Sequence, residues 1–134
     1  MRALAALAVC LLAACATTPQ PTGVAIYQPQ VGSTPVLEGP IAAAPGHHLV
    51  LGDLVATPGM VIPRHRHSGE EFLYVIGGSG TVTIEGQSDM VLGAGQGIRI
   101  EPGVAHSGVA GAQGMRAISS WVVVNGQPLR TPAP

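Results

Sequence analysis

The stretch that decides the fold runs from Gly59 to Gly78 and reads Gly-Met-Val-Ile-Pro-Arg-His-Arg-His-Ser-Gly-Glu-Glu-Phe-Leu-Tyr-Val-Ile-Gly-Gly. Because His65 and His67 are two residues apart, an extended strand would present both imidazoles on one face, and Glu71 follows at an even spacing. A further histidine, His106, comes downstream in Glu-Pro-Gly-Val-Ala-His. Imidazole and carboxylate groups are ligands that divalent transition metals accept. The sequence therefore predicts a metal site formed by these four residues.

The alternative interpretation of His-Arg-His is a polar, solvated turn, because isolated His-x-His pairs also occur by chance. The context favours metal binding, since Pro63 precedes the pair, a glycine-containing turn follows it, and an apolar strand comes next. Glu70 could replace Glu71 if that turn shifts register, although only Glu71 matches the parity of the histidines. Arg64 and Arg66 have the opposite parity, so we expect them to face away from the metal.

The same stretch resembles the first motif of the cupins, G-x5-H-x-H-x3,4-E-x6-G. Every fixed position of this motif is present, at Gly59, His65, His67, Glu71 and Gly78. The second cupin motif, G-x5-P-x-G-x2-H-x3-N, is met in part, by Gly95, Gly103 and His106. It is not met where Glu101 stands in place of the proline and Ala110 in place of the asparagine. Neither departure removes a metal ligand, and the resemblance covers roughly residues 45 to 125.

The resemblance implies a small double-stranded β-helix, or jelly-roll, barrel with the ligands of both motifs pointing inward. It implies one divalent transition metal, and the spacing of the ligands is compatible with Mn, Fe, Co, Ni, Cu or Zn. Small cupins include dioxygenases, isomerases and decarboxylases, so we expect a metal-dependent enzyme on a small molecule, of dioxygenase or isomerase type, with Glu71 as ligand or proton acceptor. The alternative is a non-catalytic module that binds a small ligand or a metal. The family also suggests a homodimer through an edge strand, with the segment before Pro45 as the exchanged or added strand.

The rest of the chain supports an all-β fold independently of the resemblance. Short β-forming runs recur at regular spacing, separated by Gly and Pro, and no convincing helix follows the N-terminal segment. We expect strands over 47–57, 70–76, 81–85, 87–92, 98–100 and 114–124, with loops between them, including a loop at 77–80. In 81–85, the alternation places Val82 and Ile84 inside.

The N-terminus is expected to be a targeting segment rather than part of the domain. Met1-Arg2 precedes an apolar run from Ala3 to Ala14 that is too short to span a bilayer but suits a signal peptide. The run ends in Leu-Ala-Ala-Cys15, which resembles a bacterial lipobox; Cys10 is a poorer candidate. Lipidation of Cys15 would place the protein at the cell envelope, on the periplasmic face of the outer membrane if the cell is Gram-negative, with no other membrane contact.

These observations divide the chain into five parts. They are a signal peptide (1–14), a lipidated N-terminus and flexible tether (15–23), N-terminal edge strands (24–44), the barrel (45–125) and a disordered tail (126–134). With Cys10 removed and Cys15 acylated, the mature domain has no thiol and therefore neither a disulfide nor a thiolate metal site. The net charge is −1 and lysine is absent, so nothing indicates nucleic-acid binding.

Several other residues could line the pocket or bind a ligand in it. Apolar candidates to line the barrel, most of them as core, are Val61, Ile62, Leu73, Val75, Val82, Ile84, Ile98, Ile100 and Trp121. His47 and His48 precede the motif and are expected to be a solvated pair rather than ligands. Arg99 and Arg116 could bind a substrate carboxylate or equally lie on the outer face. No feature names a substrate.

Overall fold

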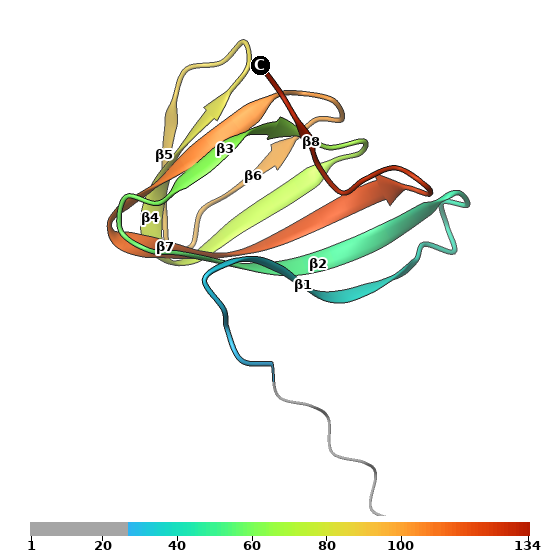
Figure 1. The fold of residues 1–134 in the computed structure, drawn as a ribbon, viewed down its shortest axis with the longest axis horizontal. Helices are drawn as coiled ribbons and strands as arrows, with labels where there is room; N and C mark the ends of the chain where they lie inside the picture. The colour runs from blue at the N-terminus through green and yellow to red at the C-terminus, as the bar shows by residue number, and fades with distance from the viewer. Residues whose placement is uncertain (1–26) are drawn as a thin grey trace, which may run out of the picture.

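Eight antiparallel strands form the domain, in a computed structural model that describes residues 27–134 (Figure 1). They are β1 (Gly32–Pro40), β2 (His47–Ala56), β3 (Val61–Arg66), β4 (Glu71–Ile84), β5 (Met90–Gly93), β6 (Gly97–Ile100), β7 (His106–Val124) and β8 (Thr131–Pro132). No helix occurs in this part of the chain, and so none that could cross a membrane. The all-β prediction is confirmed. The expected signal peptide, Cys15 and the tether lie outside the described residues.

Two long strands, β4 and β7, hold the fold together because each belongs to two sheets. The second half of β7 pairs with β2 and the first half of β4, which carry β1 and β6 on their other edges. The first half of β7 pairs with β3 and the second half of β4, which carry β8 and β5. Figure 1 shows the two sheets folded over one another, with the bend at β4 and β7. This is the expected double-stranded β-helix.

Glycines make the bend in β4 possible without interrupting the strand. The register of β4 against β7 shifts between Val75 and Gly77 and again between Gly78 and Gly80, as at β-bulges. Gly78 has φ +67°, and a Cβ there would lie 2.1 Å from the carbonyl oxygen of Gly114. The predicted loop at 77–80 is therefore wrong: these residues remain in the ladder, because glycine tolerates both the positive φ and the close crossing.

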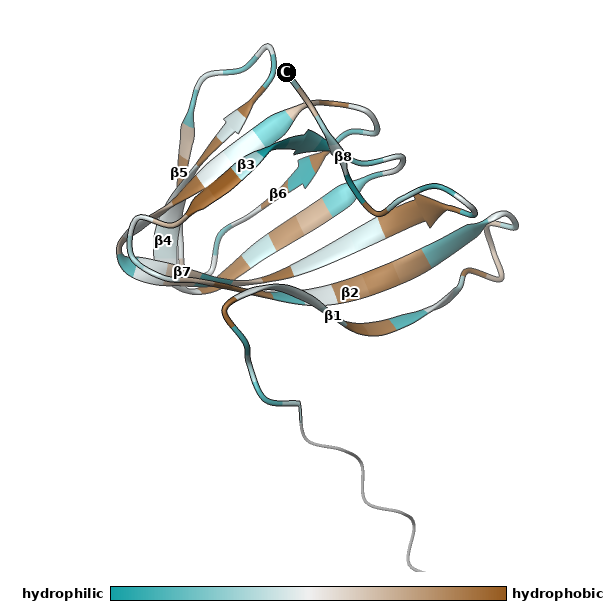
Figure 2. Cartoon of the chain, viewed as in Figure 1, coloured by the Kyte–Doolittle hydropathy of each residue, from teal (hydrophilic) through white to brown (hydrophobic). Residues whose placement is uncertain are grey.

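The core lies between the two sheets, where hydrophobic segments of both face each other (Figure 2). The larger cluster includes Leu73, Val75, Val82 and Ile84 of β4, which confirms the alternation predicted for 81–85. A smaller cluster of Val50, Trp121 and Val123 lies toward the other end, with Leu129 packed on it. Burial between two sheets is the main force that closes such a sandwich.

The two ends of the described chain differ from expectation. β1 is one nine-residue strand at the edge of β2, and Pro35 sits where its register shifts, a place where proline is tolerated. The sequence predicts a disordered tail at 126–134, but the structure pairs β8 with β3. Leu129 also packs against the smaller core cluster. These contacts tie the C-terminal segment, residues 126–134, to the open end of the barrel.

Candidate metal centre

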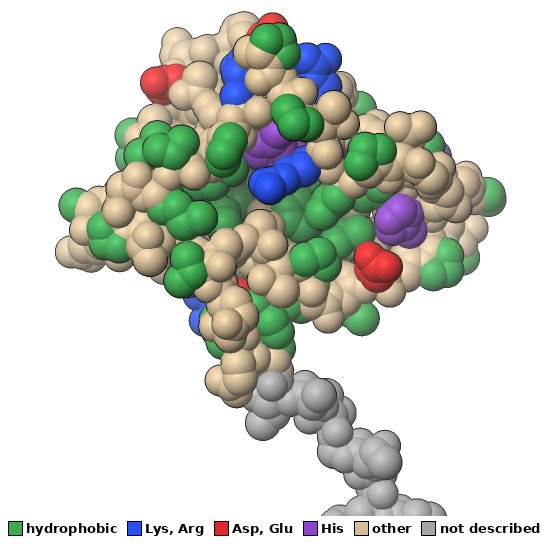
Figure 3. Space-filling view, in the orientation of Figure 1, with side chains coloured by type: hydrophobic (Ala, Val, Ile, Leu, Met, Phe, Trp, Pro, Cys, Tyr) green, Lys and Arg blue, Asp and Glu red, His purple; other side chains and the backbone are tan. Residues whose placement is uncertain are grey.

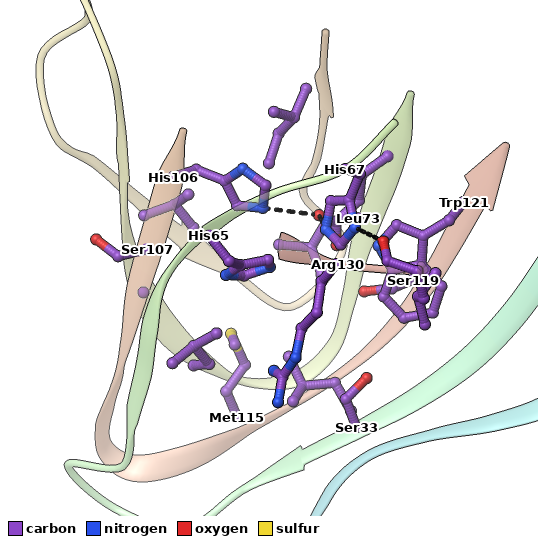
Figure 4. Close-up of a pocket in the computed structure, with 17 residues that line it drawn as sticks. Ser33, His65, His67, Leu73, His106, Ser107, Met115, Ser119, Trp121 and Arg130 are labelled. Atoms are coloured by element: carbon purple, nitrogen blue, oxygen red, sulfur yellow. Dashed lines mark hydrogen bonds and ion pairs between the residues drawn. The ribbon is translucent and has the colours of Figure 1, made fainter. Parts of the chain in front are cut away.

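The structure brings all four predicted ligands together on the inner face of the barrel. His65 is in β3, His67 follows the end of β3, Glu71 begins β4 and His106 begins β7, directly opposite His65. One ligand atom from each residue lies within 4.8 Å of the other three. All four side chains are buried, at 8% exposure or less. In Figure 4 the three histidines turn toward one another at one end of the pocket.

Backbone carbonyls fix the orientation and the tautomer of each imidazole. The Nδ1–H groups of His65 and His106 donate to the carbonyls two residues before them, Pro63 (2.7 Å) and Val104 (3.0 Å). The Nδ1–H of His67 donates to the carbonyl of Leu129, 62 residues away in the C-terminal segment. A proton on Nδ1 leaves a lone pair on Nε2 for a metal, and such partners to ligand histidines are a regular feature of metal sites.

Glu71 completes the set. Its Oε2 lies 3.1 Å from Nε2 of His67 and 3.1 Å from Nε2 of His106, yet neither nitrogen makes a hydrogen bond of good geometry. Burial would raise the pKa of Glu71, but the close contacts with His106 and His67, each of which can carry a proton on Nε2 when no metal is bound, together outweigh burial and hold the pKa at about 2. The carboxylate is therefore ionised at neutral pH. Burial lowers the pKa of His65. Burial also opposes a charge on His106, but Glu71 and the Val104 carbonyl together outweigh it and raise the pKa of His106.

The arrangement fits a divalent cation. Buried Nε2 lone pairs that point at a carboxylate oxygen repel it unless a proton or a metal ion lies among them. Three imidazoles and one carboxylate, without a thiolate, suit a first-row transition metal. Such ions often take five or six ligands, so four protein ligands leave room for water or a small molecule.

A cavity of about 380 Å³ opens over these ligands. Its wall is mostly apolar and includes Leu54, Ile62, Leu73, Val82, Ile100, Met115 and Trp121. Its polar groups besides the ligands are Ser33, Ser107, Ser119 and Arg130. Figure 3 shows the mouth of this hollow, with a histidine and a basic side chain surrounded by hydrophobic side chains. The size and lining suit a small organic molecule.

The predicted lining residues divide into three groups. Ile62, Leu73, Val82, Ile100 and Trp121 do line the cavity. Val75 and Ile84 are core residues, and Ile98 packs against the core. Val61 is 60% exposed, so its prediction is wrong: its parity in β3 is opposite to that of Ile62.

The alternatives left open by the sequence are also resolved by position. Glu70 faces outward and pairs with Arg99, so it is Glu71 that joins the histidines. Arg116 binds the buried carboxylate of Asp53 on the outer face.

Four other polar residues that the sequence set apart from the ligands lie on the outside, as expected. The Nδ1 atom of His48 lies 3.0 Å from Oδ1 of Asn125, and His47 lies near the surface; neither belongs to the ligand cluster. Arg64 donates to the carbonyl of Pro134, and Arg66 is exposed.

Sequence reasoning missed the contribution of the C-terminal segment to the site. Leu129 supplies the carbonyl that orients His67, and Arg130 lines the cavity. Ser33 comes from the N-terminal edge strand and was missed as well. No local pattern marks these residues, because a two-residue strand and a backbone carbonyl leave no periodicity to detect.

The sequence model of the family described as "Cupin domain" matches residues 53–121, just over half of the chain and all four ligand candidates. The chain belongs to the cupin family. The resemblance of the two motifs to those of cupins is thereby confirmed. No curated protein sequence matches the chain significantly.

Solved cupin structures share the fold. A cupin-like protein from Thermotoga maritima superposes with a TM-score of 0.59 at 26% identity, covering 63% of this chain and 64% of its own. The DMSP lyase DddQ from Ruegeria pomeroyi superposes with a TM-score of 0.58 at 20% identity, and the match covers 63% of this chain and 43% of the lyase chain. Oxalate decarboxylase from Bacillus subtilis, studied for its Mn(II) centres, superposes with a TM-score of 0.52 at 25% identity. The match covers 59% of this chain and 22% of the decarboxylase chain. This cupin therefore spans less than two thirds of each of them.

Proposed function

We propose that this cupin is a metal-dependent enzyme that acts on a small molecule, of dioxygenase or isomerase type. The observation that carries the proposal is the set of Nε2 lone pairs and one ionised carboxylate converging at the wall of a cavity. A site that only stabilised the fold would be expected to enclose its metal completely. Here the ligands border a space of about 380 Å³, large enough to admit a further molecule.

The chain's own groups would divide the work. His65, His67 and His106 would hold a divalent ion, and Glu71 would be a ligand or accept a proton. A bound metal would supply Lewis acidity or affinity for dioxygen. The apolar wall would exclude water from the reacting molecule. The Mn(II) centres of oxalate decarboxylase support manganese as one candidate metal.

The alternative is a non-catalytic module that binds a metal or a small ligand. The full set of four ligands favours the enzyme, because a binding module needs no reactive metal with open coordination positions.

Metal content of the purified protein tests the proposal. Elemental mass spectrometry should find about one transition metal per chain in the wild type and none in the His65→Ala/His67→Ala variant. Iron or copper would direct the search toward dioxygen chemistry, and manganese or zinc toward isomerisation or hydrolysis. If both proteins are equally empty after reconstitution with each metal, the enzyme proposal fails and the binding module replaces it.

The cellular setting is a separate proposal that rests on the N-terminal sequence. We propose that Cys15 is lipidated and anchors the protein at the cell envelope. Labelling of expressing cells with radioactive palmitate should mark the wild type and the Cys10→Ala control but not Cys15→Ala. We also propose a homodimer through an edge strand, which a monomeric mass in light scattering would exclude.

A further inference from the structure

We propose that Arg130 makes the pocket selective for small organic acids, binding a substrate carboxylate at the end of the pocket away from the metal ligands. This inference rests on the proposed function, because it names the substrate class of the same site. It assigns a role to the C-terminal segment, which the cupin motifs do not include.

The first observation is the charge of Arg130. It lines the cavity, and no ion pair or hydrogen bond to an acid is made by its side chain among residues 27–134. Of the other arginines in the described residues, Arg64, Arg99 and Arg116 each have a carboxylate partner. Arg66 has none, but unlike Arg130 it does not line this cavity. The acid in the cavity wall, Glu71, is already engaged by two histidines. Arg130 is thus a solvent-exposed cation at the edge of an apolar space, with no carboxylate partner among the described residues.

The second observation is the placement of that cation. The main chain next to it is held, because the Leu129 carbonyl accepts the Nδ1–H of His67 and Thr131 pairs with Arg66. In Figure 4 the Arg130 side chain runs from beside the histidines toward Ser33 and Met115. A guanidinium is a planar fork that binds a carboxylate through two parallel hydrogen bonds. Fixing the backbone beside it reduces the entropy that such binding costs.

The third observation is an unused donor in the same wall. The indole Nε1–H of Trp121 is buried and has no hydrogen-bond acceptor, although Trp121 lines the cavity. An unsatisfied buried donor is costly, and an oxygen of a bound ligand would satisfy it. The ring also lies against His67, with centroids 5.7 Å apart. The pocket therefore offers two kinds of donor to ligand oxygens besides a metal, while the wall between them is apolar and accepts a short carbon chain.

The test uses the full chain loaded with one metal and a series of α,ω-dicarboxylates from oxalate to glutarate. Trp121 is the only tryptophan, so its fluorescence reports binding, and calorimetry gives the affinity. We expect one chain length to bind best, because the two carboxylates must reach the metal and Arg130 together. Arg130→Gln should weaken that acid by about 10-fold to 100-fold and flatten the dependence on length. Arg130→Lys should recover part of the loss, and neutral diamides of the same length should not compete.

The matched control is Arg66→Gln, which makes the same charge change on an exposed side chain outside this cavity. Metal content is measured for every variant, so that loss of metal is not mistaken for loss of the contact between Arg130 and the carboxylate. Equal affinities and equal length profiles for wild type and Arg130→Gln, both loaded with metal, would overturn the inference.

The two proposals can fail separately. If the wild type holds no metal, the titrations are repeated on the metal-free protein with a monocarboxylate, propionate. Binding that Arg130→Gln abolishes would then support the acid site without the enzyme proposal, whereas no such dependence would overturn both.

Discussion

At the scale of single residues, the ionised state of Glu71 makes a prediction for the metal-free protein. Its pKa of about 2 is well below the ordinary 4.5, so the ionised carboxylate stabilises the fold above pH 4.5, and this contribution disappears as the pH falls toward 2. The shift corresponds to about 3 kcal/mol. In urea titrations between pH 5 and 2, the wild type should therefore lose about that much more unfolding free energy than Glu71→Gln. Parallel curves for the two proteins would contradict the proximity of Glu71 to the imidazoles.

A second residue-scale prediction concerns Gly52, which makes room for the indole of Trp121. A Cβ at position 52 would lie 2.5 Å and 2.8 Å from two ring carbons of Trp121. Gly52→Ala should therefore displace the indole, lower stability by about 1–3 kcal/mol and shift the tryptophan fluorescence. Gly39→Ala is the control, because a Cβ there meets nothing within 4 Å. If the spectrum of Gly52→Ala matches the wild type, the indole does not occupy this place.

At the scale of elements, the C-terminal segment should matter for metal binding although it contains no ligand. Deleting residues 129–134 removes the carbonyl that orients His67 and the Leu129 side chain that packs on the smaller core cluster. Loss of such a partner typically lowers metal affinity about 10-fold to 100-fold. Competition with a fluorescent chelator measures the affinity. Deleting only residues 133–134 leaves Leu129 and β8 in place and should change it little; equal losses in both deletions would refute the role of Leu129.

The strands show which elements a sequence can and cannot predict. The alternation of Thr81 to Glu85 identified the buried face, since burial on one side of a strand leaves a period of two. The glycines at 77–80 suggested a loop, because local propensity cannot distinguish a turn from a bulge held by a neighbouring strand. The path of residues 126–134 depends on partners more than 60 positions away, such as His67, which no local pattern can supply.

For the whole molecule, the site was more predictable than its surroundings. Four candidate metal ligands were predicted from the spacing of two motifs, and their side chains meet in the structure. The spacing predicts the ligands because their side chains must leave the same face of a strand. The tautomers of the histidines and the position of Arg130 depend instead on contacts that form only when the barrel closes. The pairing of β3 with both β7 and β8 brings the histidines and the C-terminal segment together.

The metal should also stabilise the whole barrel, because its ligands come from three strands. His65, Glu71 and His106 belong to β3, β4 and β7, so a bound ion would link the two sheets at the ends of these strands that lie away from the bend. A ligand that binds only the folded state stabilises it by about 2.7 kcal/mol at 100 times its Kd. Calorimetry with increasing metal should raise the melting temperature of the wild type by several degrees, and a chelator should reverse it. The His65→Ala/His67→Ala variant should not respond, and a rise of equal size in that variant would place the stabilising metal elsewhere.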